Sequence, residues 1–421
     1  MREMKESNIG WVGDIPVNWD VIRGKYLFKN KKQVVGSKVE NYERLALTLN
    51  GVIKRSKDDN EGLQPDKFDT YQILRENELV FKLIDLQNVS TSRVGLSPYI
   101  GIVSPAYIVL KGKNRINPRF AEKYYLTMWM NEVFNALGDS GVRSSLNSKE
   151  LLEISLPVPS LPEQQRIADY LDKKCGEIDS ISADIQKQIE TLEQYKASVI
   201  SEAVTKGLNP DVEFKDSGID WVGNMPGGWS VTPIYRLFYE GKKRNNLCAE
   251  TNLLSLSYGR IIRKDINANG GLLPESFRTY NIVNKDDIII RPTDLQNDKH
   301  SLRTGLVKER GIITSAYIDL VPYKDVNSDY FHYLLHTYDV KKVFYNMGNG
   351  VRQGINYTEF SKLLVLIPPV SEQQQIADYL DKKCGEIDSI IADKKSQLEV
   401  LEEYKKSLIY EYVTGKKEVA E

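Results

Sequence analysis

The feature that most constrains the fold of this chain is an internal duplication. The segment IADYLDKKCGEIDSI occupies residues 167–181 and recurs unchanged at residues 376–390, an offset of 209 positions. Chance does not produce such a match. Weaker matches keep nearly the same offset: WVGxxPxxW begins at Trp11 and Trp221, DLQN at Asp85 and Asp294, and GVR at Gly141 and Gly350. The 421 residues are therefore two copies of one unit.

The divergent middle of each copy is predicted to be a mixed α+β domain. Short segments rich in β-branched residues, bounded by Gly, Pro, Asn and Asp, predict strands at residues 78–84, 106–110, 286–291 and 316–320. Apolar residues at helical spacing predict packed helices at residues 120–137 and 329–345. The expected division of the chain is 1–160, arm and first domain; 161–207, first long helix; 208–369, linker, second arm and second domain; 370–415, second long helix; and 416–421, tail.

Each copy closes with a stretch that predicts one long helix. Apolar residues recur about every seven positions, as in a coiled coil, and we expect these side chains to pack the two helices together: Ile178, Ile185, Leu192, Val199, Ile387, Leu401 and Leu408. Ile181, Ile189 and Tyr195 are offset between these positions and are expected to belong to the same seam. A bend or break is expected at Gly176 and Gly385 because glycine weakens a helix by about 1 kcal/mol. The short connection predicts an antiparallel pair, which separates the two domains and relates them by a pseudo-two-fold axis.

Composition excludes several classes of protein. The net charge is −1, yet both variable domains are mildly basic and both helical stretches are acidic, so a polyanion would be attracted to the domains. No segment has the apolar length of a membrane helix or a secretion signal. The 3 cysteines have no metal-ligand spacing and suit a reducing compartment, so we expect a cytoplasmic protein that contacts no membrane.

The sequence contains no recognisable catalytic constellation. There is no phosphate-binding GxxxxGK[ST] loop and no glycine-rich dinucleotide turn. His332 and His336 lie four residues apart without the HExxH pattern, so packing explains them better than metal binding. We therefore expect no catalytic residue, no metal site and no cofactor bound by this chain.

Taken together, the motifs resemble one family. A GWVGxxPxxW-like arm before each domain and a PxxEQxxIAxxLDxxxxxID helix after it are similar to the DNA specificity subunits of type I restriction-modification systems. The helical motif is the specific part; it is LPEQQRIADYLDKKCGEID at residues 161–179 and VSEQQQIADYLDKKCGEID at residues 370–388, where Ser371 replaces the proline.

The resemblance implies that each domain is a target recognition domain reading one half of an asymmetric bipartite site in double-stranded DNA, while the helices set the gap between the halves. It also implies that the helices dock methyltransferase subunits, expected to be two, that use S-adenosylmethionine. A motor-nuclease subunit that uses ATP and Mg²⁺ can join them in this family.

Candidate DNA-binding residues fall into two groups. The first group recurs in both copies and is expected to hold the framework or contact phosphates more often than to read bases: Gln87, Asn88, Arg143, Asn147, Gln296, Asn297, Arg352 and Asn356. The second group lies where the copies differ and is the better candidate for specificity: Lys54, Arg55, Lys57, Arg260, Arg263 and Lys264.

Two alternatives remain open at this level. One is a coiled-coil scaffold whose end domains bind proteins, which predicts no sequence-dependent DNA binding. The other is a stand-alone nuclease built on type I-like recognition domains, which predicts that the pure chain cuts plasmid DNA with Mg²⁺.

Overall fold

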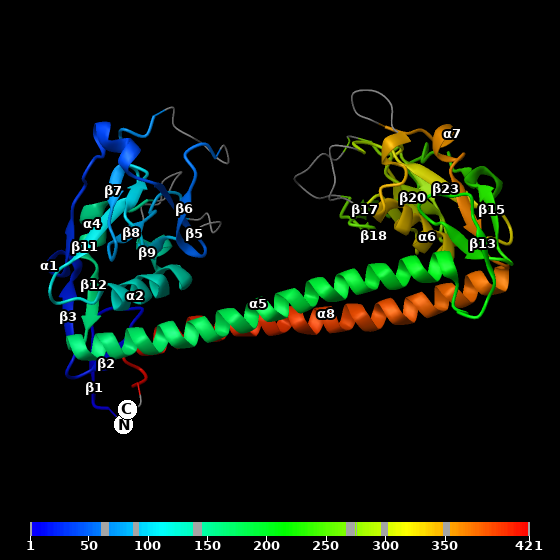
Figure 1. Cartoon of the computed structure of the whole chain (residues 1–421). Coiled ribbons are helices and arrows are strands. Elements are labelled where there is room, and N and C mark those ends of the chain that lie inside the picture. The colour runs from blue at the N-terminus through cyan, green and yellow to red at the C-terminus, as the bar shows by residue number, and fades with distance from the viewer. Residues whose placement is uncertain are drawn as a thin grey trace. The chain divides into compact units, whose positions relative to one another are not determined.

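A computed structural model describes residues 2–59, 67–86, 92–137, 145–266, 274, 276–295, 302–347 and 354–419 (Figure 1). The chain divides into two compact units, and each unit contains one copy's arm and α+β domain. Unit 1 is residues 1–185 with 395–421, and unit 2 is residues 186–394. Each unit therefore also includes the first part of one long helix and the last part of the other, so the long helices belong to neither domain alone.

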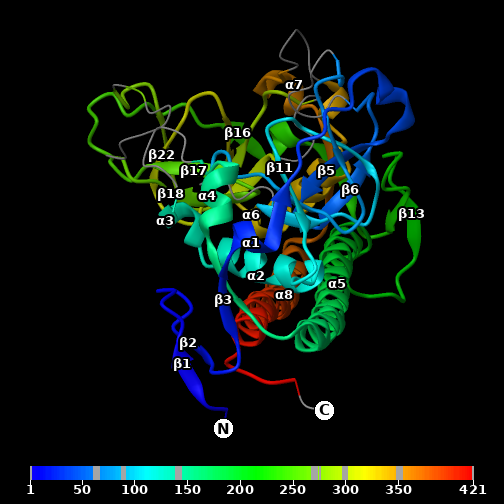
Figure 2. The same ribbon diagram turned by 90° about the vertical axis from the view of Figure 1, so that its left-hand side faces the viewer.

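The domain of unit 1 is built on two four-stranded sheets, with strand orders β4-β11-β8-β9 and β6-β5-β10-β7. Two further antiparallel pairs are β1-β2, which forms the arm (Figure 2), and β12-β3, which joins the arm to the domain (Figure 1). The strands of unit 1 are β1 Met4–Glu6, β2 Asp14–Pro16, β3 Asp20–Arg23, β4 Phe28–Asn30, β5 Arg44–Thr48, β6 Gly51–Arg55, β7 Gln72–Leu74, β8 Leu79–Phe81, β9 Val94–Leu96, β10 Gly101–Val103, β11 Ile108–Gly112 and β12 Ser155–Val158. Its helices are α1 Gly24–Leu27, the 3-10 helix η1 Gly36–Asn41, α2 Pro118–Met130, α3 Val133–Leu137 and α4 Ser148–Glu153.

Unit 2 repeats this plan, with the sheet β16-β23-β20-β21 and the pairs β13-β14, β15-β24, β17-β18 and β19-β22. Its strands are β13 Phe214–Asp216, β14 Asn224–Pro226, β15 Ser230–Pro233, β16 Phe238–Glu240, β17 Leu254–Ser257, β18 Arg260–Arg263, β19 Asn281–Val283, β20 Ile288–Ile290, β21 Thr304–Leu306, β22 Gly311–Ile313, β23 Ile318–Pro322 and β24 Leu364–Ile367. Its helices are the 3-10 helices η2 Ile234–Arg236 and η3 Tyr345–Met347, with α6 Ser328–Val340 and α7 Tyr357–Phe360.

The core of each unit explains the repeated arm. Trp19 in unit 1 and Trp229 in unit 2, the second tryptophans of the WVGxxPxxW segments, are almost completely buried. Each belongs to a large apolar cluster that joins the arm, the helix α2 or α6, and the long helices. Burying a large aromatic side chain stabilises a fold by several kcal/mol, so the arm anchors its domain to the helices.

The two long helices are α5 Leu161–Lys206 and α8 Val370–Val413. Within unit 1, the ring of Tyr170 packs at a tilt against that of Tyr412 with ring centroids 4.6 Å apart, and Lys405 forms an ion pair with Asp179. From the first of these contacts to the second, the residue number increases on α5 and decreases on α8. The two helices are therefore antiparallel within unit 1. Unit 2 shows the same direction, because Gln188 contacts Lys394 and Lys196 contacts Asp388.

Each of the four segments expected to be strands overlaps one, and helices lie in both segments expected to be helical. The expected break at Gly176 and Gly385 is wrong, since α5 and α8 continue as helices through both glycines; a bend there stays a prediction. The packing of long apolar faces outweighs a propensity cost of about 1 kcal/mol.

Candidate nucleic-acid interface

Each domain is fixed to its long helix by a buried glutamine. The side-chain oxygen of Gln164 on α5 accepts the backbone N–H of Asn117 at 2.7 Å, and its amide donates to the backbone oxygens of Pro159 and Arg115. The side chain of Asn117 in turn caps the first turn of α2. In unit 2, Gln373 and Asn327 repeat the arrangement at the start of α6. The repeated EQQ sequence thus sets how each α+β domain is attached to its long helix.

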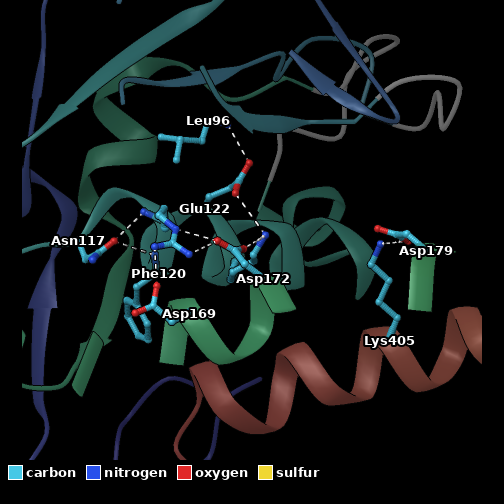
Figure 3. Close-up of polar contacts among 10 residues, drawn as sticks. Leu96, Asn117, Phe120, Glu122, Asp169, Asp172, Asp179 and Lys405 are labelled. Atoms are coloured by element: carbon cyan, nitrogen blue, oxygen red, sulfur yellow. Dashed lines mark hydrogen bonds and ion pairs between the residues drawn. The ribbon is translucent and has the colours of Figure 1, made fainter. Parts of the chain in front are cut away.

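Ion pairs reinforce this attachment in unit 1. Arg119 on α2 donates to Asp169 and Asp172 on α5, both at 2.7 Å, and Lys123 pairs with Asp172 at 2.9 Å (Figure 3). Partial burial raises the pKa of Asp172, but Lys123 and Arg119 more than offset it, so the pKa lies below its usual value. The carboxylate therefore stays charged at neutral pH and holds α2 on α5.

In each unit, the described residues that flank the DLQN and GVR segments lie side by side. After β8, the backbone of Ile84 forms a β-bridge with Ser145, and the N–H of Leu146 donates to the oxygen of Leu83 at 2.9 Å. In unit 2, the N–H of Ile355 donates to the oxygen of Pro292 at 3.0 Å. The DLQN and GVR segments are far apart in the sequence, yet residues that flank them are hydrogen-bonded neighbours in each unit. The GVR segments themselves lie outside the described residues.

In each unit, a buried arginine binds backbone oxygens at the start of the DLQN segment and just before it. Arg93 is 1% exposed, and its guanidinium donates to the backbone oxygens of Lys82, Ile84 and Asp85. Arg303, which is completely buried, donates in the same way to Thr293 and Asp294. Five fixed donors let one arginine bind several carbonyls, which makes it suited to shaping a loop.

The backbone at this point is strained in both units. Asp85 has φ of 55° and Asp294 has φ of 57°, the left-handed region that residues with a side chain seldom adopt. Such strain persists where the surrounding structure enforces it, and it concentrates at functional sites. Sequence reasoning missed Arg93 and Arg303; the signal was the shared RxGL at an offset of 210 positions.

Of the candidate DNA-binding residues that recur in both copies, two asparagines lie in the described part of the chain. Asn147 and Asn356 lie at helix starts, where their side-chain oxygens accept backbone N–H groups of α4 and α7. Their oxygens therefore serve the framework, as N-caps do. The remaining shared candidates lie outside the described residues: Gln87, Asn88, Arg143, Gln296, Asn297 and Arg352.

The divergent basic residues occupy equivalent hairpins, β5-β6 in unit 1 and β17-β18 in unit 2. Several are paired with acids in the free protein. Lys54 pairs with Glu43 at 2.6 Å, Arg55 with Asp59 at 2.5 Å, and Lys57 lies 3.8 Å from Glu40. A phosphate would have to compete with these carboxylates for the lysines and arginine.

The basic side chains of the corresponding hairpin in unit 2 are more exposed to solvent. The side chains of Arg260 and Arg263 are 76% and 72% exposed; Arg263 pairs with Glu309, and Arg260 lies 3.6 Å from Asp388. Lys264 is exposed. This hairpin presents more accessible positive charge than its counterpart in unit 1.

The seam residues of the long helices differ in burial. Ile178, Val199, Ile387 and Leu408 are buried, and Ile185, Leu192 and Leu401 are partly buried. Of the three offset residues, Ile189 is 2% exposed, whereas Ile181 and Tyr195 are 49% and 48% exposed. The expectation that all three belong to the buried seam is therefore right for Ile189 and wrong for the other two, since helical rotation leaves those two positions half exposed.

Across residues 2–419 with their gaps, no helix is long and apolar enough to cross a membrane. In the same part of the chain, no three His, Cys, Asp or Glu side chains are grouped so that they could hold a metal ion.

This architecture and sequence match a known protein family. The family model described as the type I restriction modification DNA specificity domain matches residues 1–191 and 260–400. The chain therefore belongs to the family of type I restriction-modification DNA specificity proteins.

Individual relatives agree with this assignment. The MjaX specificity subunit of Methanocaldococcus jannaschii, provisionally named as part of a type I restriction enzyme, is 25% identical over 96% of this chain and 95% of its own length. The type I restriction enzyme MjaVIII specificity subunit of the same organism is 24% identical over 82% of this chain and 80% of its own length. A solved chain from work on complex assembly and conformational transition of the type I R-M system shares the fold, with a TM-score of 0.69, 12% identity, and coverage of 96% of this chain and 99% of that chain.

Proposed function

We propose that this chain is the non-catalytic DNA-specificity subunit of a cytoplasmic type I restriction-modification complex. Each α+β domain reads one half of an asymmetric bipartite site in double-stranded DNA. The observation that carries this proposal is the pair of matching loop frameworks, each clamped by a buried arginine, beside hairpins whose exposed side chains differ. A shared framework with divergent surfaces is what two readers of different half-sites need.

The long helices supply the spacing in this proposal. At about 1.5 Å per residue, the 46 residues of α5 extend about 69 Å, enough to separate two half-sites by more than one turn of DNA. An antiparallel pair would relate the domains by a pseudo-two-fold axis, so that they read opposite strands. The helices would also dock two methyltransferase subunits, which use S-adenosylmethionine, and a motor-nuclease subunit using ATP and Mg²⁺ could join them.

Mapping of methylated adenines tests the proposal directly. The chain is co-expressed with its methyltransferase subunit, and the genomic DNA of the expression host is sequenced by a single-molecule method. We expect methylated adenines on opposite strands of one motif, with two different half-sites at a fixed gap. Modified adenines without a bipartite motif, or none above the background of the host, would exclude a specificity role.

A matched pair of variants separates reading from framework roles. Lys264→Ala in the hairpin of unit 2 should change only the half-site read by unit 2, and Lys54→Ala only the other half. Each variant thus serves as the control for the other. A variant that weakens methylation at both half-sites equally would show that its lysine contacts DNA without specifying sequence.

The nuclease alternative is tested with the pure chain. Incubated with supercoiled plasmid and Mg²⁺, the chain should leave the plasmid intact under our proposal. Conversion to nicked or linear plasmid that is lost with EDTA would favour the stand-alone nuclease.

A further inference from the structure

The hairpins β5-β6 and β17-β18 carry a basic side chain at the same position. Lys54 on β6 pairs in register with Leu45, and Arg263 on β18 pairs in register with Leu254, 209 positions later in each case. Both basic side chains are exposed, that of Lys54 by 52% and that of Arg263 by 72%. Each unit therefore presents one cation to solvent at an equivalent point of its domain.

One neighbour of this cation lies close before β5 in unit 1 and close before β17 in unit 2. It is Glu43 in the first unit and Asn252 in the second. Their backbone oxygens accept the N–H groups of Ile102 and Ile312, both at 2.9 Å, so the two positions are structurally equivalent. The side chain of Glu43 forms an ion pair with Lys54 at 2.6 Å. Unit 1 thus takes the acid that binds its cation from this position.

The other neighbour lies in the loop between β9 and β10 or between β21 and β22. It is Tyr99 in unit 1 and Glu309 in unit 2, each two positions before the second strand. The Nζ of Lys54 lies 5.2 Å from the centre of the Tyr99 ring. Glu309 instead accepts hydrogen bonds from both Nε and Nη2 of Arg263. The acid therefore occupies a different one of the two neighbouring positions in each copy, while the cation keeps its position.

The contact with Glu309 fixes the plane of the Arg263 guanidinium. A carboxylate bound to Nε and Nη2 occupies one side of this planar group. The edge formed by Nη1 and the second hydrogen of Nη2 has no acceptor among the described residues. Hydrogen bonds from Arg263, together with one from Asn252, hold the pKa of Glu309 below its usual value, so the carboxylate is charged at neutral pH. Arg263 is thus held with two adjacent N–H groups available to a ligand.

An arginine paired with a carboxylate suits the edge of a base better than a phosphate. The carboxylate of Glu309 would repel a phosphate and cancels much of the attraction that Arg263 supplies. The edge of a base carries no net charge. Guanine presents two acceptors in the major groove, O6 and N7, and one arginine can donate to both. The geometry of Arg263 therefore matches guanine.

We propose that Arg263, positioned by Glu309, reads a guanine in the half-site of unit 2. Lys54, positioned by Glu43 and Tyr99, contacts a base at the equivalent place in the other half-site. The inference rests on the proposed function, which supplies the DNA, and adds to it a predicted base. Glu309 and Glu43 are positioning residues, because each acts on the DNA through the cation that it holds.

The experiment measures base preference at each position of the target. The complex of the full chain with its methyltransferase subunit is given duplex oligonucleotides that carry the mapped motif, with each base pair of the two half-sites replaced in turn. The wild-type complex should require a G·C pair at one position, and Arg263→Ala should reduce that discrimination roughly thirtyfold without changing the other half-site. Binding of the same oligonucleotides gives the discrimination where a variant methylates too slowly.

Three further variants separate the roles of the side chains. Arg263→Lys should not restore the preference for guanine, because an ammonium group lacks the two parallel donors. Glu309→Gln should reduce the same preference roughly tenfold, since the guanidinium loses the charge that orients it. Arg310→Ala is the matched control: it removes the neighbouring ion pair with Glu250, at 3.0 Å, and should leave every base preference unchanged.

A phosphate contact predicts a different pattern of results. Arg263→Ala would then weaken binding to all sequences equally and reduce the slope of its salt dependence by about one, and Arg263→Lys would restore binding. That pattern would overturn the inference. A loss of methylation in Glu309→Gln with base preference intact would show that Glu309 serves only the structure of its loop, which also contradicts the inference.

Unit 1 supplies the reciprocal test. Lys54→Ala should relax one position in the half-site that Arg263→Ala leaves unchanged, and a change in the same half-site would contradict the equivalence of the two hairpins. If the wild-type complex methylates no bipartite motif, the proposed function and this inference both fail. If it methylates such a motif and its requirement for guanine survives Arg263→Ala, only this inference fails.

Discussion

Both units attach an α+β domain to a long helix, and they use partly different side-chain contacts to do so. Both fix their domain to the long helix through a buried glutamine and an asparagine cap, with Gln164 and Asn117 in unit 1 and Gln373 and Asn327 in unit 2. Around that shared contact the units diverge. The difference teaches which interactions the duplicated fold requires and which each copy has been free to change.

The divergence lies in the second contact between domain and helix. Unit 1 uses the ion pairs of Arg119 and Lys123 with Asp172, whereas unit 2 uses a hydrogen bond of 2.7 Å from the Tyr333 hydroxyl to Asp381. The aspartate is kept and its partner is replaced. A carboxylate at this position therefore matters to the attachment, and its donor can be a cation or a neutral hydroxyl.

The largest effect is expected from removing the buried arginines, which both units share. Arg93→Met and Arg303→Met each leave several buried carbonyls without a donor and should lower the free energy of unfolding by about 4 kcal/mol. Denaturant titration measures the loss, and Arg115→Met, at an exposed arginine, is the control. A loss below about 1 kcal/mol in either unit would mean that the loops hold their shape without the clamp.

The glutamine contact should rank next. Gln164→Ala and Gln373→Ala each remove a buried amide that bridges backbone groups of the domain, so we expect a loss of about 3 kcal/mol in each case. Hydrogen exchange at the starts of α2 and α6 reports the two units separately, and Gln186→Ala on the exposed helix surface is the control. A large effect in only one unit would show that the contact is not a common requirement.

Sequence alone predicted the features that repeat with a clear period. The duplication, the strands, and the long helices from 161 and 370 follow from exact repetition and spacing. The clamp by Arg93 was not predicted, because an isolated arginine in a short motif gives no sign of being buried. Helix rotation also could not be read from a seven-residue repeat precisely enough to place Ile181.

A buried acid distinguishes the sheets of the two units and sets a pH dependence. Asp319 on β23 stands where Val109 stands on β11, and neither of its oxygens has a hydrogen-bond partner among the described residues. Burial, with the charges of Asp287 and Glu240, raises the pKa of Asp319 to about 8. The folded state therefore holds this proton more tightly than the unfolded chain does.

The sign of the effect follows from that difference in proton binding. The contribution of Asp319 to stability is greatest below pH 3.8, falls as the pH rises towards 8, and is level above it. Asp319→Val should remove this slope and raise the free energy of unfolding by about 2 kcal/mol at pH 8. Val109→Asp is the reciprocal variant and should destabilise unit 1 with the same slope; a pH-independent gain for Asp319→Val would contradict the assigned cause.

The smallest effect should come from the contacts that differ between the units. Arg119→Ala removes partly exposed ion pairs and should loosen α2 by about 1 kcal/mol at low ionic strength, with the loss shrinking as salt screens the charges. Tyr333→Phe removes a single hydrogen bond and should loosen α6 by about 1 kcal/mol as well, with much weaker salt dependence. Hydrogen exchange of both helices at two salt concentrations measures the pair. Equal salt dependence would mean that the ionic and neutral attachments are energetically the same, and that the difference between the units is one of sequence alone.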